Sequence, residues 1–207
     1  MIMPPEGAGS VIFSDAGDGD LRSDPGARLA LSRKVGIGPE WATLRQVHGS
    51  AVIEVSQPGP AGDGDALWTT VTALPLAVFT ADCFPVVLQA PAAVGIAHAG
   101  WRGTEAGVVA KLRAAMGEAG LALQRAFVGP GIGPCCFEVG DEVAGRFPEA
   151  AAQTTWDTTS VDLVGSIRTQ VEGLEVWLGG VCTMHDRGWF SHRSNGTPQR
   201  QAALAWI

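Results

Sequence analysis

The sequence predicts an α/β protein in which strands and helices follow one another in mixed order. Short β-rich runs bounded by turn residues fill the first half, and the apolar period becomes helical after residue 104. Further strand-like runs then lie among helical segments. Consecutive strands in the first half do not fit a regular doubly wound sheet. Since no repeat or linker-like stretch interrupts the 207 residues, we expect one domain over residues 1–207.

The first half of the chain is predicted to hold one helix among several strands. The helix is expected over residues 24–36, because Pro25 stands near its start and Gly36 at its end. The strand-like runs are apolar segments separated by turn residues, and they cover residues 10–15, 42–49, 51–55, 65–70, 76–80, 85–90 and 94–100.

The second half is predicted to mix helices with strands. Thr104 is expected to cap a helix whose buried face carries Val108, Leu112 and Met116 and which ends at Gly117 or Gly120. The other expected elements are helices over 138–147 and 161–173, strands over 125–129 and 174–180, and a strand, an Asn-Gly turn and a strand or short helix over 189–207.

Composition and charge exclude several classes of protein. Lys and Arg number 14 against 21 Asp and Glu, a net charge of −7, so a nucleic-acid partner is not expected. The longest apolar stretches are broken by Asp82, Pro85 and Pro91, so no membrane span is expected. Four cysteines form neither a CxxC pair nor a secreted disulfide framework, and no signal-peptide pattern is seen. We therefore expect a cytoplasmic location.

The apolar run FTADCFPVVL (79–88) is interrupted by Asp82 and Cys83. Cys83 is either a small core residue or a thiolate presented at a bend between two strands. His48 and His98 stand in similar places, at the ends of strand-like runs and close to glycine. Two imidazoles and a thiolate are ligands that Zn²⁺ favours, and they leave a fourth position for water or substrate. Such a site lowers the pKa of the bound water to about 7.

The residues alone leave other interpretations open. Cys83 and His98 fit a nucleophile–base pair, and the histidines fit purely structural roles. Asp82 would serve either as a partner of a metal ligand or as a proton acceptor. The remaining cysteines at 135, 136 and 182 are interpreted as structural. No GxSxG, HExxH or phosphate-binding loop motif is present.

Several long motifs resemble one known family. They are QVHG, DALWTT…LAVFTADCFPVVL, GIAHAGWRGTEAGVV, GPGIGPCCFEVGDEV and CT…WFSHRSNGTPQRQAALAWI, which span the chain from about residue 10 to its end. The chain is similar to the YfiH/laccase-domain family, whose members have been called multicopper polyphenol oxidases, purine nucleoside phosphorylases and a peptidoglycan editing factor. Near the end it departs from the family pattern FFSYRRDG, because His192 stands in place of the tyrosine and Ser194-Asn195 replaces Arg-Asp.

The resemblance implies a single-domain mixed-sheet α/β sandwich with external helices, similar to the cytotoxic-necrotizing-factor-type cysteine hydrolases. It implies a metal, zinc in preference to copper, held by His48, Cys83 and His98, with Asp82 beside them as a catalytic candidate. Arg45 and Arg102 neighbour these motifs and are predicted to bind phosphate or another anion, unless they form surface ion pairs. His192 is predicted to line the substrate pocket.

The activity implied is that of a zinc-dependent purine nucleoside phosphorylase, monomeric or homodimeric, acting on adenosine, inosine, guanosine or methylthioadenosine with phosphate. Adenosine deamination would be a second activity, because it suits a zinc-activated water. The alternatives are an amidase that edits peptidoglycan precursors, a polyphenol oxidase, and a non-catalytic zinc-binding module. Four histidines are too few for multicopper oxidation, which ranks the oxidase low.

Overall fold

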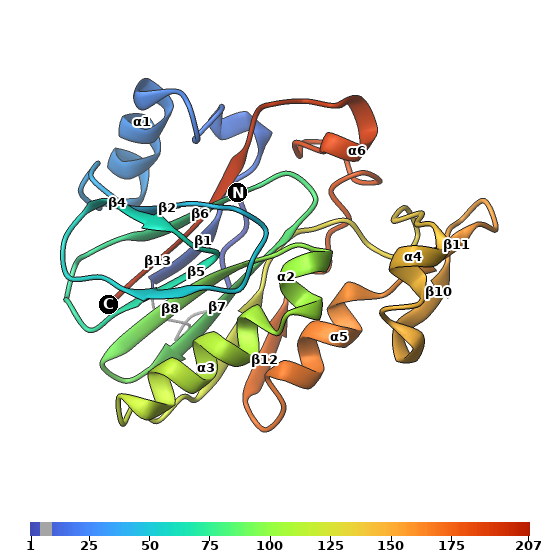
Figure 1. Ribbon diagram of the computed structural model, residues 1–207. Helices are drawn as coiled ribbons and strands as arrows, with labels where there is room; N and C mark the ends of the chain where they lie inside the picture. Colours follow the sequence, from blue (N-terminus) through green and yellow to red (C-terminus); the bar gives the residue numbers. More distant parts are fainter. Residues whose placement is uncertain (5–9) are drawn as a thin grey trace.

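Two β-sheets pack face to face, and helices cover their outer sides (Figure 1). The computed structural model describes residues 1–4 and 10–207. The predicted α/β sandwich with helices on the outside is confirmed. In the described part of the chain no helix is long and apolar enough to cross a membrane.

The first sheet has five strands in the order β1-β13-β6-β2-β4. The strand pairs β1/β13 and β13/β6 are antiparallel, whereas β2 runs parallel to both β6 and β4. The strands are β1 (Ser10–Phe13), β2 (Ala42–Arg45), β4 (Gly59–Asp63), β6 (Leu76–Thr80) and β13 (Gln201–Trp206).

The second sheet has six strands in the order β12-β9-β7-β8-β5-β3. Its outer pairs β12/β9 and β5/β3 are parallel, and its inner pairs are antiparallel. The strands are β3 (Val52–Glu54), β5 (Ala66–Thr69), β7 (Phe84–Ala90), β8 (Ala93–Ala99), β9 (Arg125–Val128) and β12 (Glu175–Leu178). A separate antiparallel hairpin pairs β10 (Ala151–Gln153) with β11 (Thr159–Val161).

The helices lie outside this sandwich. Helix α1 covers the five-stranded sheet, and α3 and α5 cover the six-stranded one (Figure 1). The α-helices are α1 (Pro25–Val35), α2 (Trp101–Glu105), α3 (Val108–Glu118), α4 (Asp141–Ala144), α5 (Leu163–Gln170) and α6 (His192–Asn195), and short 3-10 helices span Ala16–Asp18 and Pro148–Ala150.

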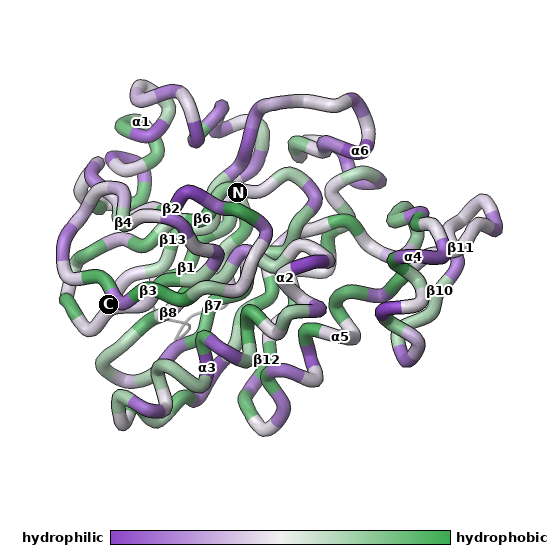
Figure 2. The backbone as a smooth tube through the Cα atoms, viewed as in Figure 1, coloured by the Kyte–Doolittle hydropathy of each residue, from purple (hydrophilic) through white to green (hydrophobic). Residues whose placement is uncertain are grey.

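Burial of apolar side chains follows these layers. The core between the sheets contains Phe13 and Leu76 from one sheet and Leu67 and Ile96 from the other. The predicted stripe on α3 is buried against the six-stranded sheet, as expected for an amphipathic helix. Figure 2 shows apolar residues concentrated on the central strands, polar residues along the connecting loops, and residues of both kinds on the helices. Burial of these apolar side chains holds the two sheets against each other, and this packing sets how the ends of their strands meet.

The chain changes sheet at residues 81–83, between β6 and β7. Asp82 has a φ of 90° there, a conformation that side-chain-bearing residues rarely adopt. The bend expected between two strands around Asp82 and Cys83 is confirmed. Because β6 and β7 lie in different sheets, this bend holds Cys83 at one edge of the sandwich.

Three local predictions are wrong. Residues 138–147 form only the single turn α4, because glycine flanks it at 140 and 145 and the residue before Pro148 is disfavoured in a helix. Thr104 lies within α2 and does not cap α3, whose N-cap is Gly107 with a φ of 73°. The strand expected after residue 189 is instead α6, with Ser191 as N-cap and left-handed Gly196 as C-cap.

Candidate metal centre and its cavity

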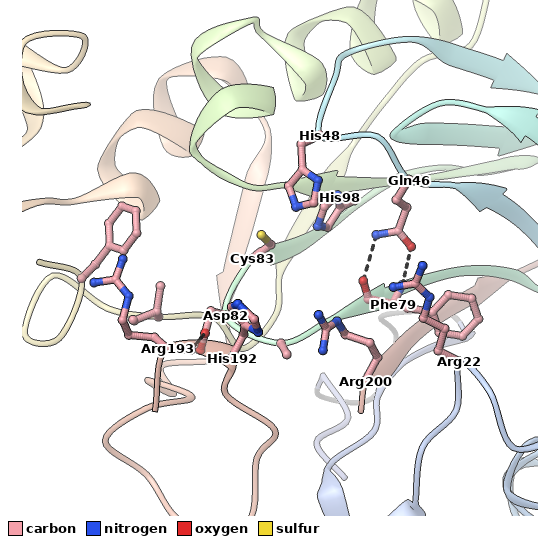
Figure 3. Close-up of a pocket in the computed structure, with 13 residues that line it drawn as sticks. Arg22, Gln46, His48, Phe79, Asp82, Cys83, His98, His192, Arg193 and Arg200 are labelled. Atoms are coloured by element: carbon pink, nitrogen blue, oxygen red, sulfur yellow. Dashed lines mark hydrogen bonds between the residues drawn. The ribbon is translucent and has the colours of Figure 1, made fainter. Parts of the chain in front are cut away.

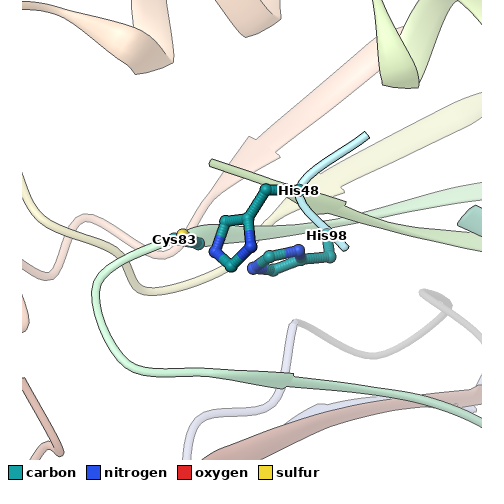
Figure 4. Close-up of side chains that lie close together, drawn as sticks. All are labelled: His48, Cys83 and His98. Carbon is teal, nitrogen blue, oxygen red and sulfur yellow. The ribbon is translucent and has the colours of Figure 1, made fainter. Parts of the chain in front are cut away.

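His48, Cys83 and His98 converge at the edge of the sandwich, although they come from three separate segments (Figure 4). Their ligand atoms all lie within 4.8 Å of one another. The two imidazole rings meet edge to face, with centroids 4.9 Å apart. The residues that the sequence nominated as metal ligands are thus brought together.

Two turns and one strand pairing make this convergence possible. His48 follows β2 in a left-handed conformation, with a φ of 60°. Cys83 follows the bend at Asp82, and His98 lies opposite Pro85 in the pairing of β8 with β7. A Cβ atom added to Gly100 would lie 2.8 Å from the Cys83 sulfur, so that residue has to be glycine.

Asp65, which sequence reasoning missed, holds the centre together. Its side chain is fully buried and accepts hydrogen bonds from the backbone N–H groups of Val47, His48 and Gly49 at 3.2, 3.0 and 2.6 Å. His98 Nδ1 lies 2.8 Å from Asp65 Oδ1. The carboxylate therefore fixes the His48 turn and directs the other ring nitrogen of His98 away from itself. In the sequence, the only feature of Asp65 was its position as the first residue of the strand-like run 65–70.

The electrostatics of the cluster suit an ion-binding role. Burial raises the pKa of the Cys83 thiol, but the charge of His98 and hydrogen bonds with both histidines outweigh it and bring the pKa to about 6. Burial lowers the pKa of His98, but the Cys83 thiolate and the hydrogen bond with Asp65 raise it to about 9. Without an ion, the cluster is thus a thiolate–imidazolium pair near neutral pH.

The residues present fit a metal ion. Two imidazoles and one thiolate form a donor set typical of zinc, and the carboxylate–histidine contact at His98 is the usual support for a ligating imidazole. The missing Cβ at Gly100 leaves room beside Cys83 and His48. The three side chains can therefore bind a metal.

A cavity of about 290 Å³ opens beside the cluster (Figure 3). Basic, aromatic and apolar side chains share its wall with the three candidate ligands. The lining residues are Arg22, Gln46, His48, Phe79, Ala81, Asp82, Cys83, His98, Ile132, Phe137, His192, Arg193 and Arg200.

Asp82 and His192, which were both nominated from sequence, line this cavity. Asp82 Oδ1 accepts a hydrogen bond from Thr183 Oγ1 at 2.8 Å, and Oδ2 accepts one from the backbone N–H of Arg193 at 2.7 Å. These contacts tie the bend to the C-terminal segment. His192 lies at the exposed start of α6.

The two arginines nominated from sequence lie elsewhere. Arg45 is 72% exposed and forms a two-pronged ion pair with Asp63. Arg102 is exposed on α2, with its guanidinium 4.1 Å from the centre of the Trp101 ring. Neither is among the described residues that line the cavity.

Three other arginines line the cavity instead, and no sequence signal singled them out. Arg22 and Arg200 come from opposite ends of the chain. They are joined by Asp20, whose Oδ1 accepts hydrogen bonds from the backbone N–H groups of both. Arg193 donates to the carbonyl of Glu138 at 2.6 Å and lies over the ring of Phe137. Only the fold reveals this basic wall.

Comparison with known proteins identifies the family of the chain. Residues 25–207 match a family model described as multi-copper polyphenol oxidoreductase laccase. The chain belongs to this family. The YlmD structure from Geobacillus stearothermophilus superposes with a TM-score of 0.79 at 28% identity, covering 90% of this chain and 81% of that one.

Curated relatives carry a different name from the family model. Purine nucleoside phosphorylase ORF3 of Streptomyces griseus is 36% identical over 91% of this chain and 85% of its own length. The purine nucleoside phosphorylase of Deinococcus radiodurans is 36% identical over 86% of this chain and 74% of its own. The resemblance seen in the sequence motifs is thereby confirmed.

Replacing Asp65 by asparagine is expected to weaken zinc binding about 10- to 100-fold. The amide has one accepting oxygen, whereas both carboxylate oxygens of Asp65 accept hydrogen bonds. Competition with a chromophoric chelator measures the affinity. Asp63→Asn is the matched control, because Asp63 is exposed and pairs only with Arg45 among the described residues. Wild-type affinity in Asp65→Asn would contradict this role.

Zinc binding is expected to release about one proton per ion near neutral pH. Between about pH 6 and pH 9 the ion-free cluster has an ionised Cys83 and a protonated His98, and the ion displaces the proton on His98. The apparent affinity should therefore rise with pH up to about 9, and fall more steeply below about 6, where the thiol also takes up a proton. Calorimetry in buffers of different ionisation enthalpy measures the release. Zero release at neutral pH would show that the ion-free cluster holds no proton for the ion to displace, with Cys83 ionised and His98 already neutral.

Proposed function

We propose that the protein is a zinc-dependent purine nucleoside phosphorylase. Its substrates would be adenosine, inosine, guanosine or methylthioadenosine together with phosphate. The observation that carries the proposal is one cavity that joins the His48/Cys83/His98 cluster to Arg22, Arg193 and Arg200. The names of the curated relatives support it. We propose adenosine deamination as a second activity of the same centre.

His48, Cys83 and His98 would hold the zinc. When bound, zinc would supply Lewis-acid polarisation of the reacting group. Asp65 keeps His98 oriented and the His48 turn in place, so the protein supplies a preformed set of ligands. Gly100 leaves the space that an ion needs beside the sulfur.

The basic wall formed by Arg22, Arg193 and Arg200, called the arginine wall below, is proposed to bind phosphate. Burial lowers the pKa of Arg200, and the charge of Arg22 lowers it further, so the two cations repel one another. The Arg22 guanidinium forms no hydrogen bond or ion pair with the described residues. A phosphate between them would relieve this repulsion and accept charge-assisted hydrogen bonds.

The apolar part of the wall suits a purine. Phe79, Ile132 and Phe137 offer flat or apolar surface to the base. Gln46 is not expected to bind the nucleoside, because its amide already forms two 2.8 Å hydrogen bonds with the backbone of Phe79 (Figure 3). His192 stands at the exposed side, where it would contact the sugar or base.

In phosphorolysis an oxygen of phosphate forms a bond to the sugar C1′ while the bond from C1′ to the purine nitrogen breaks, and a proton has to move to the departing base. Asp82 is the one carboxylate among the described lining residues, and we propose that it accepts the proton of the attacking phosphate and passes it to the departing purine nitrogen. Its hydrogen bonds from Thr183 and Arg193 hold its orientation.

Cys83→Ala is expected to remove the zinc bound at the His48/Cys83/His98 cluster and to abolish turnover. The purified zinc-loaded protein would be given each nucleoside with phosphate, and free base, sugar phosphate and ammonia would be measured with the metal content. His185→Ala is a control that removes an exposed imidazole outside the cavity. If the loaded wild type released neither base nor ammonia from any nucleoside, the proposal would fail. Amide hydrolysis that survives chelation would favour a Cys83–His98 dyad instead.

Arg22→Gln is expected to raise the KM for phosphate about tenfold, with a smaller effect on the KM for the nucleoside. The reason is the loss of a charged donor from the proposed phosphate site, since no described partner has to be disrupted. Arg45→Gln and Arg102→Gln are matched controls, because both guanidinium groups lie outside the cavity. If the phosphate KM changed in the controls and not in Arg22→Gln, the anion site would lie at Arg45 or Arg102 and not at the cavity wall.

A further inference from the structure

A second cluster of thiols lies outside the candidate metal centre. Cys135 and Cys136 stand in the loop after β9, and Cys182 follows β12. The parallel pairing of β9 with β12 continues as a bridge between Gly131 and Cys182, with Thr183 N–H donating to the Gly131 carbonyl at 3.0 Å. The sheet therefore brings the three cysteines together by its register.

We propose that Cys135, Cys136 and Cys182 form a second metal site, which takes one soft thiophilic cation, Cu⁺ or Zn²⁺. The three sulfur atoms all lie within 4.8 Å of one another, and those of Cys135 and Cys136 are 3.5 Å apart. Sulfur ligands about 2.3 Å from a zinc ion stand roughly 3.8 Å from each other. The spacing thus needs only small side-chain rotations to close around one ion.

The donor set selects the class of ion. All three donors are sulfur, which favours Cu⁺ and Zn²⁺ over harder ions such as Mg²⁺ or Ca²⁺. The backbone N–H of Gly133 points at the Cys182 sulfur from 3.2 Å, a contact that stabilises negative charge on it. Three thiolates would complete the coordination of Cu⁺, whereas Zn²⁺ would take a water as its fourth ligand.

The cluster differs from ordinary core cysteines in its accessibility. Cys136 is buried, but Cys135 and Cys182 are only partly so, and Cys182 also lines a cavity of about 190 Å³. An ion can therefore reach the sulfur atoms.

An ion at this site would brace one wall of the cavity described above. Cys182 precedes Thr183, which donates to Asp82, and Cys136 precedes Phe137, which lines the cavity. Ile132, in the same loop, donates its N–H to the Asp82 carbonyl at 2.8 Å. Binding should accordingly raise the thermal stability of the loop and the bend together.

The test separates the two sites by mutation and uses Cd²⁺ as the probe. Thiolate-to-Cd²⁺ absorption is titrated in the wild type, in Cys83→Ala, in Cys135→Ser/Cys182→Ser and in the combined triple variant. Cys83→Ala should keep one strongly absorbing site. The double variant should keep only the His48/Cys83/His98 centre, whose single thiolate gives an absorption per ion about threefold weaker than that of the three-thiolate site. The triple variant should lose the thiolate absorption of both sites. Melting temperatures without metal show that each variant is folded.

Competition with chromophoric chelators then distinguishes the two ions in Cys83→Ala. Retention of Cu⁺ or of Zn²⁺ by this variant, lost on adding Cys135→Ser/Cys182→Ser, supports the site and names its ion. A folded Cys83→Ala protein that binds no Cd²⁺, or a double variant that absorbs like the wild type, would overturn the proposal. A disulfide between two of the three cysteines in freshly purified protein would also overturn it. None of these outcomes depends on nucleoside turnover.

Discussion

The buried carboxylate of Asp65 is the interaction on which the candidate site depends. It accepts three backbone N–H groups from the turn that carries His48 and contacts Nδ1 of His98, so one side chain positions two of the three candidate ligands. Burial raises its pKa, but the contact with His98 and the backbone donors outweigh burial and keep the carboxyl ionised. A buried charge is tolerated only when its hydrogen bonds are complete, which makes the arrangement sensitive to any missing donor.

The same edge of the sandwich also joins its two sheets. His48 follows β2 of the five-stranded sheet, His98 belongs to β8 of the six-stranded sheet, and Cys83 lies where the chain passes from one to the other. An ion at the cluster would therefore tie both sheets together. The positive φ values of His48 and Asp82 fall at this junction, where such strain persists only if the surroundings enforce it. Asp65 enforces the first, and the contacts from Thr183 and Arg193 enforce the second.

Local patterns predicted most of the strands and the long helices, because apolar periodicity and glycine or proline boundaries report on the chain itself. Spatial neighbours that are far apart in sequence were harder to predict. Arg45 and Arg102 were nominated because they stand beside the motifs, yet Arg45 follows buried Leu44 on the exposed side of β2. Arg22 and Arg200 reach the cavity only because Asp20 joins the two ends of the chain. Asp65 showed no signal, since its partners are backbone groups of a distant turn.

The arginine wall bears on which nucleophile the centre would use. Water needs no cationic wall, so deamination of a neutral nucleoside would leave Arg22, Arg193 and Arg200 without a role beyond structure. Phosphate carries about two negative charges near neutral pH and would be drawn to a basic cavity even in a chain whose net charge is −7. Arg22 and Arg200 repel one another, an effect that the charges of Cys83, Asp82 and Asp20 oppose, and an anion between the two guanidinium groups would relieve it. The basic wall, more than the metal ligands, therefore favours phosphorolysis over deamination at this centre.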